Sequence, residues 1–123
     1  MGSFGRNIVA VDDSALILKM LDKVLAKKYN LYSFIDGKRA LEFLRKKAPD
    51  LVILDIDMPG ISGFDILKLI REENHLKTVP VIFLTSNNDK NHVVKAMESG
   101  ANDYVIKPID EYVLIKKIDK LLS

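Results

Sequence analysis

The sequence contains no cysteine and no tryptophan, and its apolar runs are no longer than about five residues. Without cysteine, the chain cannot form a disulfide framework, a thiolate metal site or a redox couple. The apolar runs are far shorter than the ~20 residues that span a bilayer. We therefore expect no membrane contact and no signal peptide, and a cytoplasmic location.

Charge of one sign is also lacking. The 19 basic and 17 acidic residues are interspersed and give a formal net charge of +2, which is not the electrostatic pattern of a direct nucleic-acid or membrane binder. With 123 residues and 48% hydrophobic composition, the chain is long enough for one core and too short for two. We expect one domain over residues 4–123, preceded by Met1-Gly2-Ser3, which has the composition of a cloning remnant.

What the chain does contain is a regular alternation of two periodicities. Short apolar and β-branched runs predict strands at residues 7–11, 31–35, 51–54, 79–84 and 104–106. Apolar residues at three- and four-residue spacing predict helices at residues 15–28, 37–47, 63–73, 89–99 and 110–122. Asp13 or Ser14 is available as the N-cap of the first helix. This strict alternation predicts an α/β fold, with a parallel sheet covered by helices on both faces.

The third predicted strand delivers a carboxylate to a turn. Its run Leu-Val-Ile-Leu at residues 51–54 has no polar face, so it is typical of a central strand that is buried on both sides. Asp55 follows directly, and Pro59-Gly60 turns the backbone shortly afterwards. Asp55 is thus expected at the carboxyl edge of the sheet, where open α/β folds bind their ligands.

Two more carboxylates are expected at the same edge, because Asp12 and Asp13 follow the first predicted strand. Three carboxylates in one small cleft repel one another, and a hard divalent cation bound through oxygens relieves that repulsion. Mg²⁺ fits best, since it is commonly held by one or two carboxylates together with water and phosphate oxygens.

Thr85 and Lys107 end the fourth and fifth predicted strands. A carboxylate nucleophile, a divalent ion, a hydroxyl and an ammonium are the groups needed to move a phosphoryl group onto Asp55. Each residue alone has an ordinary structural explanation: a helix cap, a strand end or a turn. Their joint occurrence at four different strand ends favours the functional interpretation.

These residues lie in four motifs, at residues 9–13 (VAVDD), 54–60 (LDIDMPG), 84–86 (LTS) and 100–108 (GANDYVIKP). With them the chain resembles, over essentially its whole length, the receiver domains of two-component response regulators. The resemblance implies a flavodoxin-like three-layer sandwich, with five parallel strands in the order 2-1-3-4-5 and five helices. Ile109 departs from the family, in which Phe is common after Lys-Pro.

The resemblance also implies a role for each residue of the site. Asp55 would be the phospho-acceptor. The Mg²⁺ ligands would be Asp12, Asp13, Asp55 and the backbone carbonyl of Asp57. Thr85 would be the switch hydroxyl, Lys107 the phosphate partner, and Tyr104 an aromatic residue that rotates on activation. The phosphoryl donor would be the phosphohistidine of a sensor histidine kinase or phosphotransfer protein. Such a domain is not an enzyme beyond Mg²⁺-dependent self-phosphorylation and slow autodephosphorylation.

The domain would produce its output by binding a partner. Phosphorylation is expected to rearrange the face made by the fourth helix, fifth strand and fifth helix, which would then bind a downstream output protein or domain, or form a phosphorylation-dependent homodimer. Four charged residues are expected on or near that face, although each is better explained as a solvated charge: Lys95, Asp103, Lys116 and Lys117.

Two other functions compete. A small phosphatase of the haloacid dehalogenase type has the signature Asp-x-Asp-x-Thr, which resembles residues 55–59, but Pro59 stands where Thr is needed. A degenerate receiver that acts only as a scaffold would not need the complete set of Asp, Thr and Lys. Asp57 is either an exposed loop charge or a modifier of the site, while His75 and His92 are expected to be solvated and not to act as ligands.

Overall fold

The computed structural model describes residues 5–123; the first four residues, including Met1-Gly2-Ser3, lie outside the described part. Five parallel strands form one sheet in the order β2-β1-β3-β4-β5. They are β1 (Asn7–Val11), β2 (Asn30–Phe34), β3 (Leu51–Asp55), β4 (Val81–Thr85) and β5 (Asp103–Ile106). The helices are α1 (Ala15–Leu25), α2 (Gly37–Lys46), α3 (Gly63–Glu72), α4 (Lys90–Glu98) and α5 (Glu111–Leu122), with a short 3₁₀ turn, η1 (Asn74–Leu76), after α3. The predicted strand order and number of helices are confirmed.

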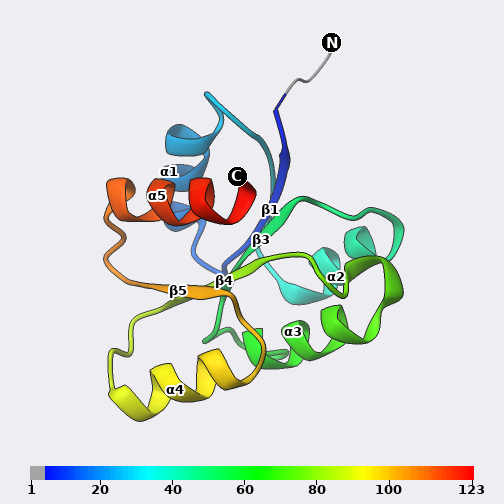
Figure 1. Cartoon of the computed structure of the whole chain (residues 1–123), viewed down its shortest axis with the longest axis vertical. Helices are drawn as coiled ribbons and strands as arrows, with labels where there is room; N and C mark the ends of the chain where they lie inside the picture. The colour runs from blue at the N-terminus through cyan, green and yellow to red at the C-terminus, as the bar shows by residue number, and fades with distance from the viewer. Residues whose placement is uncertain (1–4) are drawn as a thin grey trace.

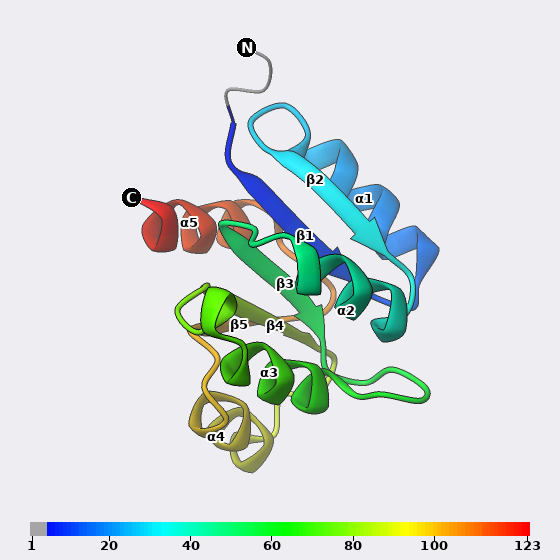
Figure 2. The ribbon, with the colours of Figure 1, turned by 90° about the vertical axis from the view of Figure 1, so that its right-hand side faces the viewer.

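The molecule has three layers. Helices α1 and α5 cover one face of the sheet, while α2, α3 and α4 lie on the other side (Figures 1 and 2). The core is accordingly divided into two clusters, one on each face. All five residues of β3 and of β4 are buried, which explains why their sequences are continuous apolar runs rather than alternating ones.

Several predicted boundaries are wrong by a few residues. Helix α1 ends at Leu25 rather than at residue 28. Residues 26–28 form turns, in which Lys28 donates its N–H to the carbonyl oxygen of Leu25 at 3.1 Å, and Tyr29 after them is buried. β4 begins at Val81 and not at residue 79, after Pro80. Ser14 is the N-cap of α1, since its side chain accepts the N–H of Ile17 at 3.3 Å, and Asp13 is left outside the helix.

The loop between β3 and α3 is held close to the end of β3. Ser62 and Asp65 form a capping box at the start of α3, and Gly60 takes a positive φ of 82° in the turn after Pro59. A Cβ atom at Gly63 would collide with the backbone carbonyl oxygen of Asp55. The start of α3 therefore packs directly against the backbone of the predicted acceptor, and a side chain at position 63 would push it away.

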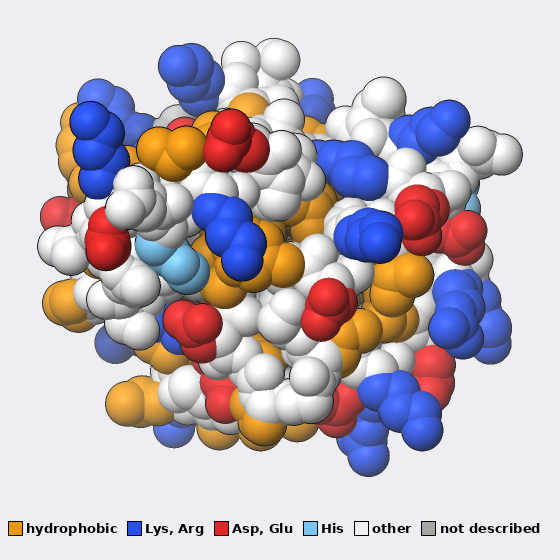
Figure 3. Space-filling model, turned by 90° about the horizontal axis from the view of Figure 1, so that it is seen from below, with side chains coloured by type: hydrophobic (Ala, Val, Ile, Leu, Met, Phe, Trp, Pro, Cys, Tyr) orange, Lys and Arg blue, Asp and Glu red, His pale blue; other side chains and the backbone are white. Residues whose placement is uncertain are grey.

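None of the helices within residues 5–123 is long and apolar enough to cross a membrane. Figure 3 shows the molecule of Figure 1 as seen from below, on the side where α3 and α4 lie. On this face basic, acidic and hydrophobic side chains are intermixed. The face thus lacks a patch of one charge sign, in line with the interspersed charges of the sequence.

Candidate functional site

The register of the sheet brings the predicted site residues together at its carboxyl edge. Val11 of β1 pairs with Leu54 of β3, so the residues that follow them, Asp12 and Asp55, are neighbours. On the other side of β3, Asp55 pairs with Leu84, which precedes Thr85. Thr85 in turn pairs with Ile106, the residue before Lys107. Four strand ends thus converge, with Asp55 on the central strand.

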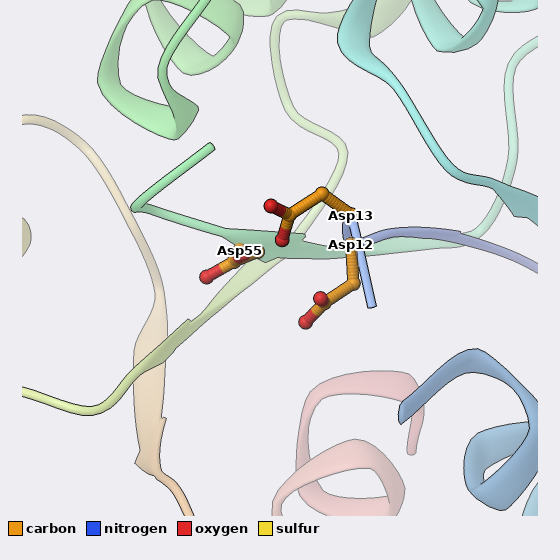
Figure 4. A group of neighbouring side chains, drawn as sticks. All are labelled: Asp12, Asp13 and Asp55. Atoms are coloured by element: carbon orange, nitrogen blue, oxygen red, sulfur yellow. The ribbon is translucent and has the colours of Figure 1, made fainter. Parts of the chain in front are cut away.

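Three carboxylates form the acidic cluster, which is shown in Figure 4. Asp12, Asp13 and Asp55 each offer one oxygen, and these oxygens lie within 4.8 Å of one another. Asp12 is fully buried and Asp55 is 2% exposed, whereas Asp13 is exposed. Oδ1 of Asp12 accepts the N–H of Ser14 at 2.9 Å, and Oδ1 of Asp55 accepts the N–H of Asp57 at 3.3 Å.

Lys107 supplies the positive charge next to this cluster. Its Nζ lies 2.9 Å from Oδ2 of Asp12 and 3.3 Å from Oδ1 of Asp55. Burial by itself would lower the pKa of Lys107, but the carboxylates of Asp12 and then Asp55 outweigh burial and leave that pKa above its usual value. The ammonium therefore stays charged. The peptide bond that follows it, to Pro108, is cis.

One ammonium does not fully compensate two buried carboxylates. The pKa of Asp55 is raised from 3.8 to about 6, first by burial and second by the charge of Asp12, with Lys107 and the N–H of Asp57 acting in the opposite direction. Asp55 is therefore a carboxylate whose negative charge is only partly compensated by the surrounding groups of the protein. A further cation beside it would favour its ionised, nucleophilic form.

The residues present fit a hard divalent cation. The donor set consists of oxygens only, and no histidine nitrogen or cysteine sulfur belongs to it. Oδ2 of Asp12 is buried and receives no well-aligned hydrogen bond, although the Lys107 ammonium is beside it. Asp13 is exposed at the mouth of the cluster. A cation would thus find a buried ligand on one side and open access on the other.

Thr85 is 1% exposed at the end of β4. Its Oγ1 accepts the N–H of Asn87 at 3.0 Å and lies 3.2 Å from Nε2 of His92. The expectation that His92 is solvated is therefore wrong. His92 is partly buried in the first turn of α4 because that turn folds back over the end of β4. The spacing of seven residues from Thr85 was the only signal in the sequence, and by itself it does not indicate a contact.

The second histidine, His75, is exposed as expected, but its Nε2 lies 2.7 Å from the carbonyl oxygen of Leu44. Gly63 is a further residue that sequence reasoning missed, although a glycine directly after a capping serine was a visible signal.

Tyr104, the predicted rotating aromatic, lies on β5 at one edge of the sheet. Its ring is partly buried and packs against the core cluster under α2, α3 and α4. The Nζ atom of Lys117 lies 5.1 Å from the ring centroid and also binds Oδ1 of Asp103 at 2.7 Å. Tyr104, Pro108, Val113 and Lys117 help to line a shallow cavity of ≈ 280 Å³.

The charged residues that were expected on the face of α4, β5 and α5 do not all make contacts there. Asp103 and Lys117 pair with each other there, and Lys116 lies 5.0 Å from the ring centroid of Tyr112 on the same helix. Lys95 points elsewhere, with its Nζ 4.7 Å from the ring centroid of Phe64 at the start of α3. Lys95 is therefore better described as a contact between α3 and α4.

Asp57 lies two residues beyond Asp55 and is exposed. Its backbone N–H binds Asp55, but no hydrogen bond or ion pair of its carboxylate is found within residues 5–123. In a phosphatase that used Asp55 and Asp57, a general acid or base would have to lie within hydrogen-bond reach of the reacting group. The exposed side chain of Asp57 does not favour that function.

The chain matches the response regulator receiver domain family over residues 8–119. The transcriptional regulatory protein AfsQ1 of Streptomyces coelicolor is 36% identical over 94% of this chain and 51% of its own length. The chemotaxis protein CheY4 of Vibrio cholerae has a similar structure, with a TM-score of 0.90, 28% identity and coverage of 96% of this chain and 99% of that one. The beryllofluoride-activated receiver domain of DrrB, from Thermotoga maritima, has a TM-score of 0.88 at 32% identity, covering 97% of this chain and 98% of its own.

The chain therefore belongs to the receiver domains of response regulators, a family of signalling domains. The recognition made from the four motifs and the flavodoxin-like fold of the CheY type are confirmed. The chain spans about half or less of the length of the curated relatives that it matches, some of which are DNA-binding regulators.

Proposed function

We propose that this chain accepts a phosphoryl group on Asp55 from the phosphohistidine of a sensor histidine kinase or a phosphotransfer protein. The observation that carries the proposal is the environment of Asp55: a buried carboxylate on the central strand, beside two further aspartates and one lysine. Burial and the charge of Asp12 raise its pKa to about 6, so positive charge added beside it favours the ionised, nucleophilic form.

In the transfer, a carboxylate oxygen of Asp55 attacks the phosphorus atom while the bond from phosphorus to the donor imidazole breaks. The bonding electron pair stays on that imidazole nitrogen, and an acyl phosphate forms on Asp55. Asp12 and Asp13 would hold Mg²⁺ together with the backbone carbonyl of Asp57. When bound, Mg²⁺ supplies charge that offsets the carboxylates and the phosphoryl oxygens.

Lys107 and Thr85 would act on the product. The ammonium of Lys107, already 3.3 Å from Oδ1 of Asp55, would pair with a phosphoryl oxygen, and the hydroxyl of Thr85 would donate to another. Movement of Thr85 would open space for Tyr104, whose ring is partly buried at the edge of the sheet. The chain would remain a binding module whose only chemistry is to gain and slowly lose one phosphoryl group in the cytoplasm.

The readout would be the face of α4, β5 and α5. This face carries the shallow cavity beside Tyr104 and the exposed side chains of Tyr112 (67%) and Val113 (39%), which suit an apolar contact with a partner. The partner would be an output protein or an attached output domain, with a phosphorylation-dependent homodimer as a further form. Support comes from AfsQ1, a transcriptional regulator about twice as long as its match to this chain.

Intact mass spectrometry after incubation with acetyl phosphate and Mg²⁺ tests the proposal. We expect a mass increase of one phosphoryl group in the wild type and in Asp57→Asn, and none in Asp55→Asn. Persistence of the increase in Asp55→Asn would refute the assignment. Repeated turnover of an aryl phosphate ester would favour the phosphatase instead.

A further inference from the structure

The first turn of α4 brings a histidine to the hydroxyl of Thr85. Nε2 of His92 lies 3.2 Å from Oγ1 of Thr85, in a partly buried position. The other polar neighbours of this hydroxyl are local, because they both belong to Asn87: its N–H at 3.0 Å and its carbonyl oxygen at 3.4 Å. Within residues 5–123, His92 is therefore the partner of Thr85 Oγ1 that comes from another secondary-structure element.

The contact restrains Thr85 in either tautomer of the imidazole. A threonine hydroxyl has one proton and two lone pairs, and one lone pair already accepts from Asn87. If Nε2 of His92 is unprotonated, it accepts the only proton of the hydroxyl. If Nε2 carries a proton, it fills the second lone pair. In both cases Oγ1 is held toward α4, and no hydrogen bond joins Thr85 to Asp55 in the described part of the chain.

The imidazole of His92 is itself held in place. It packs edge-on against the ring of Phe64, with centroids 6.0 Å apart and an interplanar angle of 77°. Phe64 in turn packs edge-on against Phe83 of β4, at 5.4 Å. His92 thus lies between α3 and the end of β4, so it does not simply follow Thr85 when that side chain turns.

We propose that His92 is a positioning residue of the phosphoryl site, which holds the Thr85 hydroxyl away from Asp55 in the unphosphorylated chain. Turning Thr85 toward a phosphoryl oxygen breaks the contact with His92 and releases the first turn of α4 from β4. This inference rests on the proposed transfer to Asp55. It adds a direct contact between Thr85 and α4 to the proposed effect of Thr85 on Tyr104.

The expected shift in the rotamers of Thr85 follows from the strength of the hydrogen bond between His92 and Thr85. One hydrogen bond that exists only in the resting state biases the two rotamers of Thr85 by roughly three- to tenfold. A ligand that binds only when Thr85 is turned inward should gain the same factor once the bond is removed.

Two variants separate the hydrogen bond from the packing. His92→Phe keeps an aromatic ring against Phe64 but has no nitrogen near Thr85. His92→Gln loses the ring but places a polar atom about as far along the side chain as Nε2. His75→Phe is the matched control, because His75 also binds through Nε2 but contacts the carbonyl oxygen of Leu44.

The direct measurement is the χ1 rotamer of Thr85, read from three-bond couplings to its methyl carbon in metal-free protein without a phosphoryl donor. We expect one dominant rotamer in the wild type, His92→Gln and His75→Phe, and a shift of the population by roughly three- to tenfold in His92→Phe. A Thr85 rotamer that is unchanged in His92→Phe would overturn the proposal.

The second measurement is the apparent affinity for beryllofluoride at saturating Mg²⁺, which should rise by the same factor in His92→Phe and stay near the wild-type value in His92→Gln. Equal affinities in all variants would overturn the coupling to the site. If the wild type binds no beryllofluoride at all, the proposed function fails, whereas the rotamer measurement still decides whether His92 positions Thr85.

Discussion

The ammonium of Lys107 lies 2.9 Å from Oδ2 of Asp12, closer than its 3.3 Å distance to Oδ1 of Asp55. The group expected to bind the phosphoryl oxygens thus pairs most closely with a proposed metal ligand. Lys107 and a divalent ion therefore compete for Asp12, and the loss of either leaves more negative charge in the cluster.

Lys107→Met should consequently have opposite effects on stability and metal binding. The variant leaves Asp12 and Asp55 buried without a counterion, so we expect the metal-free fold to lose about 2–4 kcal/mol. Mg²⁺ should bind several-fold more tightly, because a competing and repelling cation has been removed. Urea unfolding in EDTA and calorimetric Mg²⁺ titration measure the two quantities. Lys68→Met, an exposed lysine of α3, is the control, and weaker Mg²⁺ binding by Lys107→Met would contradict the competition.

The stability of the metal-free chain should depend on pH through Asp55. Because burial and Asp12 raise its pKa to about 6 from 3.8 in the folded state, folding is favoured while Asp55 is protonated in both states, below about pH 3.8. This contribution is lost as the pH rises through about 6, since the unfolded chain then ionises more readily. Asp55→Asn cannot ionise, so it keeps the stability that the wild type loses as the pH rises. Above pH 6 the variant should be more stable than the wild type by about 1–3 kcal/mol.

Urea unfolding in EDTA between pH 4 and 8 tests this dependence. The difference between Asp55→Asn and the wild type should grow from pH 4 to 6 and stay constant above pH 7. Asp22→Asn, at an exposed aspartate of α1, serves as the comparison. A constant difference across the whole range would show that Asp55 is not held in an unfavourable charged state.

Mg²⁺ should stabilise the wild type, because it relieves repulsion among three carboxylates whose oxygens lie within 4.8 Å of one another. Asp13→Ala should raise the melting temperature of the metal-free chain and reduce the response to Mg²⁺. Asp22→Ala should change neither. Thermal melts with and without millimolar Mg²⁺ provide the measurement, and a wild type that does not respond to the ion would exclude a shared acidic site.

Asp57→Asn should weaken Mg²⁺ binding several-fold and speed phosphorylation by acetyl phosphate at saturating Mg²⁺, with a smaller change in dephosphorylation. The exposed carboxylate of Asp57 acts mainly through its charge, which attracts Mg²⁺ and repels an anionic donor. Calorimetric Mg²⁺ titration and the decay of the phosphoprotein are compared. An unchanged Mg²⁺ affinity together with a large change in decay would instead identify Asp57 as a base acting on water.

The sequence by itself determined the order of strands and helices along the chain. It also determined that the carboxyl ends of the five parallel strands lie at one edge of the sheet. Both are local properties, because the period of apolar residues distinguishes strand from helix, and parallel strands all present their carboxyl ends on the same side. The residues at those ends, Asp12, Asp55, Thr85 and Lys107, could therefore be predicted as neighbours. Boundaries were less well determined, as at α1, which ends at Leu25 and is followed by turns at residues 26–28.

Only the tertiary structure decided how the side chains pair. Lys107 reaches past the neighbouring strand β4 to Asp55 and Asp12, and the sum of burial and these charges sets the pKa of Asp55. His92 contacts Thr85 because α4 packs back over the end of β4 and Phe64 supports the ring. Such contacts depend on strand order, side-chain rotamers and burial. These are long-range properties of the folded chain, and no local pattern in the sequence encodes them.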